Sequence, residues 1–272
     1  MFDGEQVIES DQLKNKQVVS QYKASTGKLH EQERDISKSW FYEDQEILII
    51  GIENQNDIDK QIVLRTIGYD AAQYKEQYTK TSELVVPIIT IVLYYGNLHW
   101  EQSQSLSEVS KPIPEKAQRF YSDYQTNIIE IAWLSDEQLD MFTSDFGIIA
   151  RFFVEIRRNK NYIPKDKTKL DHPDEVLKLL AVMTKDNRYE KILAGERQVK
   201  NMCEVAERLV NMGIERGRVE GIERGIERGR EEERIHLLVK LVNNGNLGIE
   251  IAAMELGVTS DEFKRKVEEF DN

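Results

Sequence analysis

The amino-acid sequence predicts an α/β domain followed by an α-helical C-terminal extension. Two short apolar segments, residues 46–52 and 85–95, have the length and the β-branched composition of buried strands. Between them, residues 59–80 place apolar side chains at helical spacing. Strand, helix and strand at this length are typical of an α/β crossover, with both strands covered by helices.

The composition excludes several classes of protein. The chain has 272 residues, which allows one domain with an extension or two small domains. A net charge of −12, from 49 acidic and 37 basic residues, argues against a broad basic surface for non-specific binding of nucleic acid. The single cysteine, Cys203, excludes an internal disulfide, and the four histidines lack the spacing of a zinc site.

The sequence also predicts where the protein resides. The longest apolar stretch, residues 84–95, is shorter than the roughly 20 residues that span a membrane, and it contains Pro87. The N-terminal residues have no apolar run after a basic start, so we expect no signal peptide. These features predict a cytoplasmic protein without a membrane partner.

Proline clusters divide the chain into three expected parts, residues 1–165, 166–212 and 213–272. In the first part, Trp40 to Tyr42 are expected to form the edge of a further strand. From residue 115 onward the apolar spacing becomes helical. Helices are predicted over residues 115–124, 136–145, 146–160, 174–184 and 188–212.

The third part carries a glycine repeat. Glycines recur every four residues from Gly213 to Gly229 and form a stripe on the predicted helix. Each glycine costs a helix about 1 kcal/mol relative to alanine, but the stripe would let a second helix approach closely. The segment is therefore either a charged helical linker or a helix-pairing segment that forms a homo-oligomer. A small helical hairpin follows, with Ser260 expected to cap its second helix, and its acidic residues argue against DNA reading.

Two acidic residues form the candidate chemical site. Asp35 lies where a strand is expected to begin, and Glu53 lies at the polar end of the strand 46–52. If these strands are neighbours, both carboxylates and the backbone carbonyl of Asn54 can bind one Mg²⁺, Mn²⁺ or Ca²⁺. Such a cation lowers the pKa of a bound water and polarises a phosphate. Gln55 shares the face of Glu53 and would orient that water or contact the phosphate. From spacing alone, the alternative is ordinary polarity where a strand leaves the core.

Longer segments of the sequence resemble a known family. These are GIENQNDIDKQIVLRTIGYDAAQY, PIITIVLYYGNLHW and the Gly-Arg-Glu repeat. They resemble the recombination-promoting nucleases (Rpn), also labelled transposases, of the PD-(D/E)XK nuclease superfamily, over about residues 30–100. The resemblance implies a restriction-endonuclease-like mixed sheet flanked by helices, and metal-dependent hydrolysis of DNA in recombination or mobile elements. Relatives usually carry a helix and an acidic residue before the first strand, so the core is expected to begin late here, near Glu5 and Glu9.

The resemblance also implies roles for residues of the site. Asp35 matches the strand aspartate of the superfamily and Glu53 its acidic residue, while Gln55 stands where lysine is usual. Glutamine lacks the positive charge that stabilises a developing phosphorane, so Arg65 or Lys60 is expected to supply it.

Further residues are expected to assist. Arg65 and Tyr69 lie one turn apart on the predicted helix, and the resemblance implies that they face the site; the alternative is an ordinary helix surface. Phosphate contacts supply most non-specific affinity for DNA. The expected phosphate contacts are Arg157, Arg158, Lys160 and Lys165, and the alternative is a solvated basic loop.

The sequence leaves two alternatives to an active nuclease. The chain is then either a catalytically inactive relative that binds DNA or protein, or an assembly protein whose working part is the glycine-rich helix.

Overall fold

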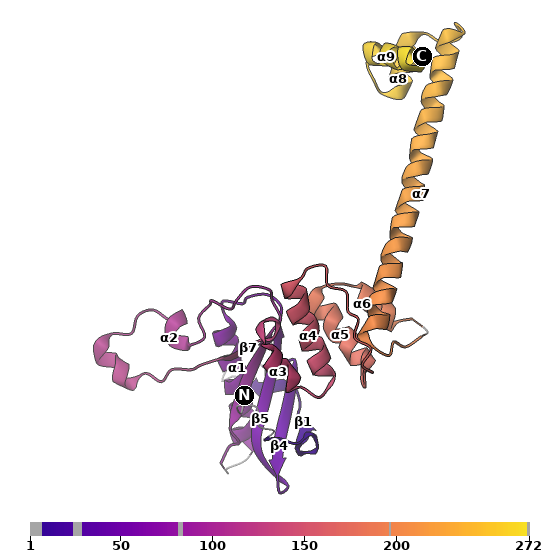
Figure 1. Ribbon diagram of the computed structural model, residues 1–272. Helices are drawn as coiled ribbons and strands as arrows, with labels where there is room; N and C mark the ends of the chain where they lie inside the picture. Colours follow the sequence, from indigo (N-terminus) through magenta and orange to yellow (C-terminus); the bar gives the residue numbers. More distant parts are fainter. Residues whose placement is uncertain (1–6, 24–28, 81–83, 196, 271–272) are drawn as a thin grey trace. The chain divides into compact units, whose positions relative to one another are not determined.

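The computed structural model describes residues 7–23, 29–80, 84–195 and 197–270 (Figure 1). The chain divides into two compact units, Met1–Ala206 and Glu207–Asn272. The expected acidic position at Glu5 lies outside the described residues.

A mixed five-stranded sheet forms the centre of the first unit, in the order β1-β4-β5-β6-β7. Its strands are β1 (Leu13–Asn15), β4 (Ile36–Tyr42), β5 (Gln45–Gln55), β6 (Ile88–Tyr94) and β7 (Asn127–Glu130). The pairs β1–β4 and β4–β5 are antiparallel, whereas β5–β6 and β6–β7 are parallel. A separate antiparallel ribbon consists of β2 (Val19–Lys23) and β3 (Leu29–Glu33).

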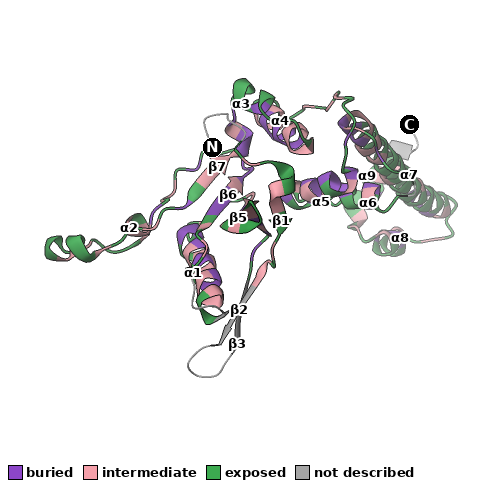
Figure 2. Cartoon of the chain, turned by 90° about the horizontal axis from the view of Figure 1, so that it is seen from below, coloured by how far each residue is buried: buried purple, intermediate pink, exposed green. Residues whose placement is uncertain are grey.

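Helix α1 (Ile62–Lys80) makes the predicted crossover between β5 and β6. Its residues Ile62 and Val63 are fully buried against Val92 and Tyr94 of β6. Helix α4 (Asp145–Arg158) lies on the opposite face, where the ring centroid of Phe153 is 4.9 Å from that of Tyr95 (Figures 1 and 2). A mixed sheet flanked by helices, with a helical C-terminal region, confirms the predicted fold class.

The connection between β6 and β7 leaves the sheet as an arm (Figures 1 and 2). It carries α2 (Leu106–Val109) and the 3₁₀ helix η3 (Glu115–Phe120). The helix expected over residues 115–124 is therefore wrong in type and length, because only Glu115–Phe120 are helical and they form a 3₁₀ helix. None of the residues of η3 is buried, so this segment has no packed face to extend it into an α-helix.

The remaining helices of the first unit follow β7. They are η4 (Ile131–Trp133), α3 (Asp136–Asp140), α5 (Pro173–Thr184) and α6 (Arg188–Leu193). The continuous helix expected over residues 188–212 is also wrong, because α6 ends at Leu193, two residues before Gly195. A new helix, α7 (Met202–Asn243), begins after Asn201, whose side-chain oxygen accepts a hydrogen bond from Glu204 N–H at 2.9 Å.

The second unit contains most of α7 together with α8 (Ile249–Leu256) and α9 (Ser260–Phe270). Its core joins α7 to the other two helices through Ile235, Leu238, Val239, Ala252, Ala253 and Phe263. Gly257 has a φ of 73° and ends α8 in the left-handed conformation that favours glycine. The cap of α9 is Thr259 rather than the expected Ser260, because Thr259 Oγ1 accepts from Glu262 N–H at 3.3 Å.

In the part of the chain that the structure describes, no helix combines the length and the apolar character needed to cross a membrane.

Candidate active site

The register of the β4–β5 hairpin brings Asp35 and Glu53 together. Ile36, the first residue of β4, pairs with Ile52, so Asp35 lies opposite Glu53 at the end of the hairpin. Strand β5 continues to Gln55, and Asn54 N–H donates to Asp35 Oδ2 at 2.7 Å. Of the two carboxylates that the sequence singled out, Asp35 therefore directly precedes β4 and Glu53 lies in the neighbouring β5.

A buried ion pair beneath the site fixes this end of the hairpin. The Arg34 side chain is 1% exposed, and its Nη2 lies 2.5 Å from Asp70 Oδ1 of α1. Arg34 Nη1 donates to Thr90 Oγ1 of β6 at 2.6 Å, and Tyr124 O–H donates to Asp70 Oδ2 at 2.6 Å. Because Arg34 is anchored to two other elements, the backbone of the adjacent Asp35 is held in place.

Gly51 of β5 makes room for this ion pair. A Cβ at this position would lie 1.7 Å from Arg34 Nη1 and 3.2 Å from Thr90 Oγ1. The close approach of the guanidinium to the strand therefore requires glycine. Arg34 and Asp70 were not predicted as part of the site. The available signal was that Asp70 shares helical spacing with the buried positions of α1.

Glu53 is buried without full compensation for its charge. Its side chain is 1% exposed, and among the described residues its Oε1 has no hydrogen-bond partner. Burial raises the pKa of the Glu53 carboxyl, the charge of Asp35 raises it as well, and the net value is about 7. Arg65, whose Nη2 lies 3.6 Å from Glu53 Oε2, and the more distant Arg34 act in the opposite direction.

Helix α1 presents Arg65 to the site. Arg65 Nη1 is held by Asp59 Oδ2 at 2.8 Å, and Arg65 Nη2 donates to the Tyr69 hydroxyl at 3.3 Å. The Arg65 side chain remains 40% exposed, so it is accessible to a ligand. The ring of Tyr69 also lies 5.4 Å from the guanidinium carbon of Arg34, and thus beside both basic residues.

Strand alternation assigns Glu53, Asn54 and Gln55 to different faces. Glu53 pairs with Val92 and Gln55 with Tyr94, and both partners pack toward α1. Glu53 and Gln55 therefore share the α1 face. The Asn54 side chain lies on the other face, where its Oδ1 accepts from the Tyr95 hydroxyl at 3.1 Å. Its backbone carbonyl points to the same side as its N–H, toward the Asp35 end of the hairpin.

The donors at this end of the hairpin fit a hard cation. The unpartnered Glu53 Oε1, the Asp35 carboxylate and the Asn54 carbonyl are oxygen donors of the kind that Mg²⁺, Mn²⁺ and Ca²⁺ prefer. In the described part of the chain, no group of three or more His, Cys, Asp or Glu residues can hold a metal. A cation here would thus need backbone and water oxygens beside the two carboxylates.

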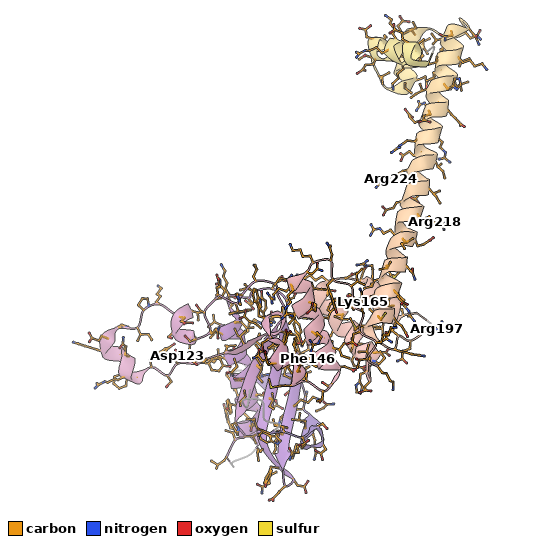
Figure 3. All side chains as sticks on the ribbon, viewed as in Figure 1. Asp123, Phe146, Lys165, Arg197, Arg218 and Arg224 are labelled. Atoms are coloured by element: carbon orange, nitrogen blue, oxygen red, sulfur yellow. The ribbon has the colours of Figure 1, made fainter. Side chains whose placement is uncertain are left out.

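The four expected phosphate contacts have different surroundings. Arg157 Nε donates to the Ala132 carbonyl at 2.6 Å. Arg158 is paired with Asp136 at 3.1 Å and with Glu155 at 3.0 Å. Lys160 and Lys165 are exposed, and Lys165 is labelled in Figure 3.

A mixed sheet with a carboxylate pair at the end of its central hairpin defines a protein of the restriction-endonuclease-like fold class. Residues 43–170 match the model of the family described as "Putative transposase, YhgA-like". The match confirms the predicted resemblance to the Rpn-like family over this segment. No curated protein and no solved structure matches the chain. The matched residues include Glu53, Arg65 and Tyr69. Asp35 lies outside the match, but the β4–β5 hairpin places it opposite Glu53.

The raised pKa of Glu53 makes stability depend on pH when no cation is bound. The folded-state pKa of about 7 lies above the ordinary value of 4.5, so protonated Glu53 stabilises the fold in acid. This stabilisation is lost as the pH rises through about 7. Between about pH 5 and about pH 8 in EDTA, we expect the free energy of unfolding to fall by about 1–3 kcal/mol more in the wild type than in Glu53→Gln. Chemical denaturation measures the difference.

The matched control is Asp44→Asn, at the turn that closes the same hairpin at its other end. Asp44 has a φ of 64°, which asparagine tolerates. This variant should keep the pH dependence of the wild type. The same pH dependence in Glu53→Gln would contradict the assignment.

Proposed function

We propose that the protein is a metal-dependent DNA endonuclease that hydrolyses phosphodiester bonds. One observation carries the proposal: Glu53 buries a carboxyl oxygen that has no partner among the described residues, next to a second carboxylate. Burying such a group is unfavourable unless a ligand compensates its charge. A divalent cation between Asp35 and Glu53 supplies that compensation.

The residues around the carboxylates have distinct roles in this proposal. A bound cation supplies a water of lowered pKa and polarises the phosphate. Asp35, Glu53 and the Asn54 carbonyl hold it. Gln55 orients the attacking water or contacts the phosphate from the same face as Glu53. Arg65 provides positive charge where the phosphorane develops, and Tyr69 positions its guanidinium.

The family match supports DNA as the substrate. The description of the family as transposase-like favours a role in DNA recombination or in mobile elements. The exposed basic side chains at Lys160 and Lys165 are proposed to add phosphate contacts.

Removal of either carboxylate tests the nuclease function. Asp35→Asn and Glu53→Gln keep the size of the side chain but remove the charge that holds the cation. We expect each to lower the initial rate of Mg²⁺- or Mn²⁺-dependent nicking of supercoiled plasmid by at least about 100-fold. The control Asp44→Asn should nick at the wild-type rate.

Undiminished nicking by both variants would rule out this site. No nicking by the folded wild-type protein in any of the three cations would instead favour an inactive relative that binds DNA or protein.

We also propose that α7 pairs with a second copy of the chain. A Cβ built at Gly213, Gly217, Gly221, Gly225 or Gly229 meets nothing within 4 Å in the described structure. Three isoleucines beside this stripe, Ile214, Ile222 and Ile226, are at least half exposed. Acid–base pairs such as Arg216–Glu220 cover the other faces, and Arg218 and Arg224 project from the helix (Figure 3).

Bulky substitution on the stripe tests this pairing. Gly221→Gln with Gly225→Gln fills the space that a second helix needs and should convert the assembled protein to a monomer, as measured by light scattering. Gly221→Ala with Gly225→Ala favours the helix by up to about 2 kcal/mol and should largely preserve assembly. A wild-type monomer, or an assembled glutamine variant, would contradict the proposal.

A further inference from the structure

Three side chains form a stacked column beyond the carboxylate site. Trp133 belongs to η4, which directly follows β7, and its ring stacks on His99 with centroids 3.5 Å apart and an interplanar angle of 26°. The guanidinium carbon of Arg157, from α4, lies 3.9 Å from the centroid of the Trp133 ring. Two groups cannot occupy the same face at these distances without overlapping. Trp133 is therefore sandwiched between His99 and Arg157.

The sandwich determines which groups can meet a ligand. Both faces of the indole are covered, so Trp133 has no free face on which a nucleic-acid base could stack. The guanidinium of Arg157 is oriented by the bond from Nε to the Ala132 carbonyl and by the ring beneath it. Its two terminal amino groups form no ion pair with any residue that the structure describes. They remain as paired donors, a geometry that suits phosphate.

His99 adds a second polar group to the column. Its side chain is 54% exposed, and its Nδ1 lies 3.3 Å from Glu130 Oε1. The same Glu130 oxygen accepts the backbone N–H of Trp100 at 2.6 Å, so this carboxylate is already engaged. The other ring nitrogen of His99, Nε2, is the atom left for a ligand.

The column lies at the same edge of the sheet as the carboxylates. Gln55 pairs with Tyr94, and Tyr94 pairs with Glu130, at the carboxyl ends of three adjacent parallel strands. β5 and β7 are two strand spacings apart, which is about 10 Å. Ligands of α/β sheets bind outside the carboxyl ends of parallel strands. A DNA strand laid across this edge would reach from Glu53 and Gln55, on the α1 face, to Arg157, which comes from α4 on the other face.

We propose that the column of His99, Trp133 and Arg157 binds a backbone phosphate of the DNA strand, beside the phosphate that is cut. The inference rests on the proposed nuclease function, because it takes DNA as the ligand. Arg157 donates hydrogen bonds from both terminal amino groups to the phosphate, and a protonated Nε2 of His99 donates a further one. Trp133 acts as a spacer that holds the two in a fixed arrangement. Arg158 has no part in this site, because Asp136 and Glu155 already pair with it.

The salt dependence of DNA binding tests the column without cleavage. The affinity of the full chain for a fluorescein-labelled DNA duplex is measured by anisotropy in EDTA over a series of salt concentrations. Loss of one phosphate contact lowers the slope of log K against log salt by about 0.9 and the affinity at about 0.1 M salt by roughly tenfold. We expect this change in Arg157→Gln. Arg157→Lys keeps the charge and should retain the slope.

The neighbouring Arg158→Gln is the matched control on the same helix and should keep the wild-type slope. His99→Gln, a change at an exposed side chain, should weaken binding by a smaller factor. The proposed phosphate site would be contradicted if Arg157→Gln kept the wild-type slope. It would also be contradicted if Arg157→Gln and Arg158→Gln lost the same amount of affinity for DNA. No nicking by the folded wild-type protein would instead overturn the nuclease function and leave the measured phosphate contact standing.

Discussion

The buried ion pair between Arg34 and Asp70 is the interaction on which the site depends. It connects the start of β4 to α1 and, through Thr90 and Tyr124, to β6 and the end of the arm. Removal of one partner from a buried ion pair costs about 3–5 kcal/mol, because it leaves the other charge uncompensated. Glycine at position 51 leaves room for this pair, and the pair in turn fixes the position of Asp35.

In contrast to this ion pair, the buried carboxylate of Glu53 is energetically unfavourable. The same hairpin that buries it also places a second carboxylate beside it. Among the described residues, Arg65 forms an ion pair with Glu53 at 3.6 Å, and Arg34 and the Asp35 backbone add weaker compensation. A protein under selection for stability alone would not retain such a pair, because apolar or neutral residues would pack there at lower cost. Residues that are unfavourable for stability in this way concentrate at functional sites. The arrangement therefore supports the proposed cation.

Part of this architecture could be predicted from the sequence. The apolar runs at 46–52 and 85–95 and the helical spacing between them predicted the β5–α1–β6 crossover, because burial on both faces leaves a continuous apolar signal. The convergence of Asp35 and Glu53 was predicted from where strands begin and end. Strand β7 was missed, since its four residues are too few for a pattern. Long-range contacts also left no local signal: Arg34 and Asp70 are 36 residues apart, and Trp133 meets both His99 and Arg157 only in the folded chain.

Anomalous diffraction from crystals soaked in Mn²⁺ tests most directly whether a cation binds between Asp35 and Glu53. We expect one strong peak within about 2.0–2.5 Å of oxygens from Asp35, Glu53 and the Asn54 carbonyl, with water completing the coordination. The peak should disappear in Glu53→Gln crystals and persist in those of Asp44→Asn. A Mn²⁺-soaked wild-type crystal without a peak between Asp35 and Glu53 would contradict a cation site at this end of the hairpin.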